Sequence, residues 1–93
     1  MNKDRFHNQL ALRLGYDRIA NNKGLAIKVE YDNPNDPRIV IELPEGVTER
    51  FYASEEPAVV KDKVNRPEAP ILEIVEAAHE AYLDSMNDIY YSK

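Results

Sequence analysis

The sequence contains no cysteine and no tryptophan, and no run of its apolar residues is longer than three. The lack of cysteine excludes disulfides, thiolate catalysis and Cys-ligated zinc together. A membrane-spanning helix needs about 20 predominantly apolar residues, and the apolar region of a signal peptide needs about 7–15. Arg13 interrupts the only candidate for such a region near the start. We therefore expect a cytoplasmic protein that does not contact the membrane.

The overall composition is typical of a folded domain. Of the 93 residues, 43% are hydrophobic and 31% are charged, and there are only three glycines and six prolines. Disordered chains are less hydrophobic, and collagen-like or low-complexity chains contain far more Gly and Pro. Domains usually contain about 100–150 residues, and the sequence shows no internal repeat or linker. We therefore interpret residues 1–93 as a single domain.

Hydrophobic periodicity predicts an α+β fold. Phe6, Leu10 and Leu14 recur at helical spacing, whereas the two segments that follow alternate between apolar and polar side chains as half-buried strands do. Asx residues and prolines at 32–37 predict a hairpin loop longer than the common two residues. The expected order is a short N-terminal helix (3–14), a three-stranded antiparallel β-meander (25–31, 38–43, 48–53), a short helix capped by Ser54 or else an edge strand within 54–69, and a long C-terminal amphipathic helix (71–90) packed on one sheet face.

The helix predicted over 71–90 has two different faces. At about 100° per residue, an apolar stripe that we expect to contact the sheet consists of Ile71, Val75, Ala78, Tyr82, Met86 and Ile89. The opposite face is acidic, with Glu73, Glu76, Glu80 and Asp84, and with Asp88 at its edge. No lysine follows these acids at i+4, so like charges repel along the row. Selection for helix stability alone would not produce this arrangement, which favours a role in binding.

The net charge of −5 is unevenly distributed along the chain. Residues 1–31 carry a net charge of +3, residues 32–67 carry −3, and residues 68–93 carry −5. Carboxylates three or four residues apart on a helix lie about 5–6 Å apart, which is comparable with the phosphate spacing of a nucleic-acid strand. Such a row could compete for the Lys and Arg side chains of a basic groove. The alternative interpretation is an ordinary solvated helix face.

The sequence lacks the motifs that catalysis and metal binding usually require. No hydroxyl lies in a nucleophile motif, and the glycines stand alone in turns. A hydrolase or metal enzyme would need His7 and His79 to converge, and each is better interpreted as a histidine at the edge of the core. The acidic turn at 32–37 departs from an EF-hand, because prolines occupy its third and sixth positions. We therefore predict no enzyme activity, no metal and no cofactor.

Direct nucleic-acid binding is not expected either. The net charge is negative, whereas phosphate binding depends on Lys and Arg side chains that release counterions. A helix-turn-helix that began near Leu10 would have its second helix cut short by Gly24, too soon for a recognition helix.

Two functional hypotheses remain. In the first, the chain is a small non-enzymatic acidic protein-binding module, an inhibitor or regulator that engages a basic, nucleic-acid-binding surface of a larger protein. Its predicted partner-binding residues are Glu73, Glu76, Glu80, Asp84, Asp88, Tyr90 and Tyr91. In the second, the chain is a self-associating structural or assembly subunit. The basic N-terminal part of one copy would meet the acidic C-terminal helix of another, and a homodimer would bury Leu72, Leu83 and Tyr90.

Overall fold

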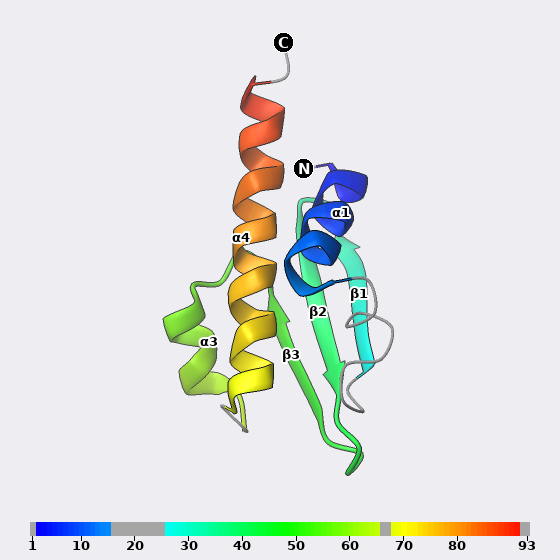
Figure 1. Cartoon of the computed structure of the whole chain (residues 1–93), viewed down its shortest axis with the longest axis vertical. Helices are drawn as coiled ribbons and strands as arrows, with labels where there is room; N and C mark the ends of the chain where they lie inside the picture. The colour runs from blue at the N-terminus through cyan, green and yellow to red at the C-terminus, as the bar shows by residue number, and fades with distance from the viewer. Residues whose placement is uncertain (1, 16–25, 66–67, 92–93) are drawn as a thin grey trace.

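The computed structural model describes residues 2–15, 26–65 and 68–91, with side chains as far as Met86 in the last range. The element order is α1 (Lys3–Leu14), β1 (Ala26–Asn33), β2 (Asp36–Glu42), β3 (Thr48–Tyr52), α3 (Pro57–Lys63) and α4 (Ala69–Tyr91). The strands form one antiparallel sheet in the order β1-β2-β3. Helices α1 and α4 cover one face of this sheet, and α3 lies alongside α4 (Figure 1). The predicted α+β architecture is confirmed.

Helix α1 begins and ends where local side-chain chemistry allows. The side chain of Asn2 accepts a hydrogen bond of 3.0 Å from the backbone N–H of Arg5, which satisfies one of the free donors of the first turn. At the other end Gly15 has a φ of 83°, a conformation that favours glycine, and its N–H donates to the carbonyl of Ala11. Between these ends, the predicted apolar positions are buried against the sheet and α4: Phe6, Leu10 and Leu14.

The sheet separates an apolar face from a polar face because side chains alternate along each strand. Ile39 of β2 pairs with Val29 of β1 and with Phe51 of β3, and these side chains point toward the helices. On the other face Val40 lies between Lys28 and Arg50. Val40 is only 4% exposed, and its two cross-strand neighbours have long side chains whose stems can cover it.

The loop between β1 and β2 is shorter than the sequence predicts. Asn33 pairs with Asp36, so the loop consists of Pro34 and Asn35, and the side chain of Asn33 accepts a 2.9 Å hydrogen bond from the N–H of Asn35. The register of β1 shifts between Glu30 and Asn33, which indicates a β-bulge. The expectation of a longer loop was wrong, because the bulge absorbs an extra residue and lets the ladder continue through the Asx-rich segment.

The undecided segment after β3 forms the short helix α3, which was one of the two alternatives. Its N-cap is Glu56, which makes no side-chain cap hydrogen bond, and Pro57 follows at the first helical turn. The prediction that Ser54 caps this helix was wrong. Ser54 instead binds Asp36 at the start of β2, through its Oγ at 2.6 Å and its N–H at 3.2 Å. This contact fixes the turn between β3 and α3 to the neighbouring strand.

The buried side of α4 differs from the predicted stripe. Ile71, Val75 and Ala78 are buried as expected and Tyr82 is half-buried, but Met86 is 41% exposed. The side chain of Ile89 lies outside the described residues. As far as Met86, four further residues of α4 are buried: Ile74, Ala77, Ala81 and Ser85. The buried arc is rotated toward α1, because α1 packs against α4 and the small side chains on that flank permit a close approach.

Candidate partner-binding face of the C-terminal helix

The candidate binding face is the outward side of α4, which carries Glu73, Glu76 and Glu80. All three residues are exposed, and their spacing of three and four residues keeps them in one row along the helix. The buried side of α4 lies on the opposite side of this row. The structure therefore brings these three predicted residues together on one surface, which we call the acidic row.

Arg13 of α1 contacts the next part of the acidic face. Its Nε donates to Glu80 Oε2 at 3.2 Å, and its Nη2 donates to Asp84. Gln9, one turn earlier on α1, accepts a 2.6 Å hydrogen bond from Nη1 through its side-chain oxygen. The interpretation of the face as a purely repulsive array is therefore wrong at this end. The compensating cation belongs to α1, whereas the i+4 rule considers only residues of the same helix.

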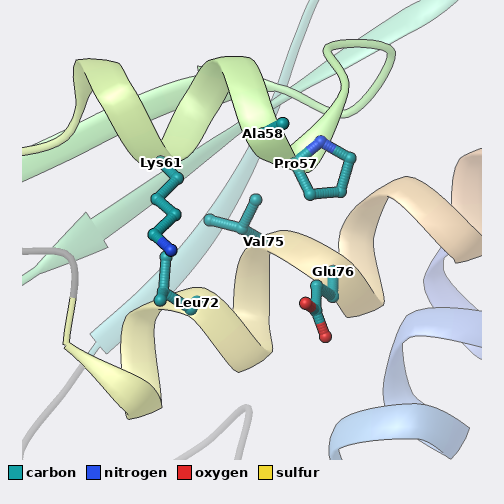
Figure 2. Close-up of a pocket in the computed structure, with 6 residues that line it drawn as sticks. All are labelled: Pro57, Ala58, Lys61, Leu72, Val75 and Glu76. Carbon is teal, nitrogen blue, oxygen red and sulfur yellow. The ribbon is translucent and has the colours of Figure 1, made fainter.

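A groove opens between α3 and α4 beside the acidic row. It encloses about 260 Å³ and is lined by Pro57, Ala58, Lys61, Leu72, Val75 and Glu76. Figure 2 shows that α3 supplies one wall and α4 the other. Pockets for small molecules usually measure about 300–1,000 Å³. The groove is smaller than that, so it suits one apolar side chain of a partner better than a whole metabolite.

Glu76 belongs to both features, since it lies in the acidic row and also at the rim of the groove. Lys61 approaches from the α3 side (Figure 2). Between these charged groups the wall is apolar, with the side chains of Leu72 and Val75. The arrangement combines an apolar recess with the carboxylate of Glu76 on one rim and the ammonium of Lys61 on the other.

The apolar surface of α4 continues beyond the groove. Leu83 is 46% exposed and Met86 is 41% exposed. The C-terminal turns of α4 extend past α1 and past the sheet (Figure 1). Leu72 and Leu83 were both predicted to be buried in a homodimer. In the structure Leu72 lines the groove, and Leu83 is exposed.

The remaining predicted residues lie in the last turns of α4, where side chains are outside the described residues. They are Asp88, Tyr90 and Tyr91. Their assignment to a partner-binding surface stays a prediction.

The two histidines lie in different parts of the fold. His79 is half-buried on α4, and its Nδ1 lies 2.9 Å from the carbonyl oxygen of Ala53, to which a protonated Nδ1 can donate. This contact is made at the turn that leads into α3, whereas His7 is exposed on α1, on the other flank of α4 (Figure 1). Among the residues with described side chains, no three His, Cys, Asp or Glu residues are grouped as a metal ion would require.

Sequence reasoning missed the groove and the role of Arg13. The groove needs α3, and the run 58–61 was too short for its periodicity to separate helix from strand. Pro57 after an acidic pair was the available signal, because proline is common at the first helical position. No local pattern connects Arg13 with residues that lie 67 and 71 positions later.

Comparison with known proteins adds no relative: no protein-family model, no curated protein and no solved structure matches this chain. Within the described ranges, none of the helices has the length and apolar character that crossing a bilayer would require.

Proposed function

We propose that the chain is a small non-enzymatic protein-binding module whose helix α4 engages a basic surface of a larger protein. The observation that carries this proposal is the position of Glu76, which joins the exposed acidic row to the apolar groove. A partner segment with Lys or Arg beside an aliphatic side chain would satisfy both parts at once. A role as an inhibitor or regulator follows if the basic surface that it covers has a ligand of its own.

The acidic row would act mainly through long-range attraction. Complementary charge raises the association rate and selects against acidic partners, while the apolar recess supplies contact area that survives at high salt. Because exposed charges are screened over about 8 Å at physiological ionic strength, we expect the affinity to fall with added salt without disappearing.

Glu76→Lys is the most direct test of this proposal. Arg13 hydrogen-bonds to Glu80 and Asp84 rather than to Glu76, so reversal of Glu76 should leave the α1–α4 packing intact and the melting temperature nearly unchanged. Proteins retained by the wild type from a native lysate would be identified by mass spectrometry, and the affinity of a purified candidate would be measured for both forms. We expect Glu76→Lys to weaken binding about tenfold or more, as loss of a charge-assisted contact does.

The variant Glu45→Lys provides a matched control. Glu45 is exposed in the turn between β2 and β3, and its reversal changes the net charge by the same amount as Glu76→Lys. If the control weakens binding as strongly as Glu76→Lys, only the total charge matters and the site on α4 is wrong. Unchanged affinity of Glu76→Lys would also refute it.

The alternative role as a self-associating subunit loses part of its original support. It required the basic N-terminal part of one copy to meet the acidic helix of another. In the structure Arg13 already contacts Glu80 and Asp84 within the same chain, so this charge complementarity is partly used inside the monomer. A different surface, the outer edge of β1, carries a better argument for self-association.

A further inference from the structure

Strand β1 lies at one edge of the sheet, because β2 is its only strand partner among the described residues. The direction of its backbone groups follows from the ladder. The N–H of Ala53 donates to the carbonyl of Pro37 at 2.9 Å, so Pro37 and every second residue after it in β2 direct their hydrogen-bonding groups toward β3. Arg38 and Val40 therefore direct theirs toward β1.

The register between β1 and β2 then shows which backbone groups of β1 point toward β2 and which point outward. Lys28 pairs with Val40, and Glu30 pairs with Arg38, so Lys28 and Glu30 use their backbone groups within the sheet. The intervening residues Ile27 and Val29 direct their N–H and C=O groups outward, and Tyr31 follows at the bulge, where the regular alternation is interrupted. An outward row of this kind is a template for another strand.

The side chains of this edge are complementary to themselves in one register. Within the chain, Lys28 Nζ binds Glu42 at 2.8 Å and Arg38 binds Glu30 at 2.6 Å. If a second copy of β1 pairs antiparallel about Val29, Lys28 of each copy lies opposite Glu30 of the other, so these internal ion pairs join across the edge. Ile27 then lies opposite Tyr31 of the second copy. A shift by two residues in either direction places Lys28 opposite Lys28 or Glu30 opposite Glu30, which is unfavourable. The charges thus select the symmetric register and disfavour its neighbours.

The apolar side of the same edge supports this pairing. Ile27, Val29 and Tyr31 are half-buried on the side of the sheet that the helices cover. The pKa of Tyr31 is raised, first by burial and then by the carboxylate of Asp4, and Lys3 Nζ lies 5.0 Å from the centre of its ring. Pairing about Val29 would join these half-buried side chains to those of the second copy and remove more apolar surface from water.

We propose that the chain forms a symmetric dimer through antiparallel pairing of β1 with β1 of a second copy. The two sheets become one continuous sheet, and the twofold axis runs perpendicular to it. This symmetry keeps the helices of both copies on the same side, so both acidic rows face the same direction. A dimer of this kind would present two copies of the α4 surface to a partner and gain avidity. The dimer itself does not depend on the function proposed for α4.

Charge-reversed variants test the register. Lys28→Glu places a new glutamate opposite Glu30, and Glu30→Lys places a new lysine opposite Lys28, twice in each dimer. We expect each single variant to dimerise about tenfold more weakly than the wild type, measured by sedimentation equilibrium from micromolar to millimolar concentration. An equimolar mixture of the two variants should recover association, because every opposed pair is then a glutamate with a lysine. Arg50→Glu on the other edge strand is the matched control and should dimerise as the wild type does.

Hydrogen exchange of the wild type provides a second measurement that needs no variant. The N–H groups of Lys28 and Glu30 should be protected at every concentration, since they bond to β2. The N–H of Val29 should become protected only as the concentration rises through the dimerisation range. A chain that stays monomeric, a dimer insensitive to both reversals, a mixture that does not associate, or a Val29 N–H whose exchange does not change with concentration would each overturn the proposal.

Discussion

The contact of Arg13 with α4 leads to a quantitative prediction about stability. Arg13→Met keeps an unbranched apolar side chain and good helix propensity but removes the guanidinium. The side chain of Arg13 is 27% exposed, and those of Glu80 and Asp84 are 65% and 38% exposed. Pairs this accessible contribute about 0.2–1 kcal/mol each because solvent screens them. Loss of both therefore destabilises the fold by roughly 0.4–2 kcal/mol.

The assay is thermal and urea unfolding at low and at high salt. In a domain of this size, 1 kcal/mol corresponds to about 4–8 °C in melting temperature. We expect the difference between Arg13→Met and the wild type to shrink at about 1 M salt, where the Debye length is about 3 Å. Combination with Asp84→Asn should be less destabilising than the sum of the single changes, since both remove the same contact.

Two results would refute this reasoning. If Arg13→Met is as stable as the wild type, the ion pairs contribute nothing and the acidic face has no compensation from α1. If the loss is as large at high salt as at low salt, packing of the arginine stem rather than charge accounts for it. Arg50→Met removes the same charge from an exposed position and should change stability by no more than about 0.5 kcal/mol.

Two further predictions concern the core and the response to acid. Ile39 is fully buried in the central strand, so Ile39→Ala should lower the free energy of unfolding by about 2–5 kcal/mol and Ile39→Val by about 0.5–1.5 kcal/mol. Urea midpoints at unchanged m-value measure both losses. A loss below about 0.5 kcal/mol for Ile39→Ala would contradict its place in the core. Burial raises the pKa of Glu55, but hydrogen bonds from Lys63 and from the Tyr52 N–H outweigh it and leave the pKa below its ordinary value of 4.5. This carboxylate therefore adds stability that is fully present above pH 4.5 and is lost as pH falls through the lowered pKa of the folded state. Glu55→Gln should lose less stability than the wild type between about pH 5 and pH 3 in unfolding titrations, and equal losses would contradict the assigned contacts.

The sequence was informative about the candidate site where the site depends on one helix. Glu73, Glu76 and Glu80 share a face because α4 is continuous through them, and helical spacing alone predicts that. The groove was not predictable in the same way, because its second wall belongs to α3. The contact of Arg13 with Asp84 joins residues 71 positions apart, and only the packing of α1 against α4 brings them together.

Two of the errors in the predicted fold came from judging a side chain by its neighbours in the sequence, whereas residues distant in the sequence determine its surroundings. Ser54 resembled a helix cap but binds Asp36, which is 18 residues earlier. Met86 continued the apolar stripe of α4 but is exposed, because the buried side of the helix at that level is the side that carries Ala81 and Ser85.

The sequence by itself determined the elements other than α3 and the absence of thiol chemistry, because periodicity, capping residues and composition act over a few neighbouring residues. It also determined the acidic row, since one helix carries all of it. The tertiary structure alone decided which flank of α4 is buried, which acids Arg13 neutralises, and where a groove opens beside Glu76. These features depend on how helices pack on the sheet. That packing follows from the shapes and volumes of side chains distant in the sequence, which no local pattern records.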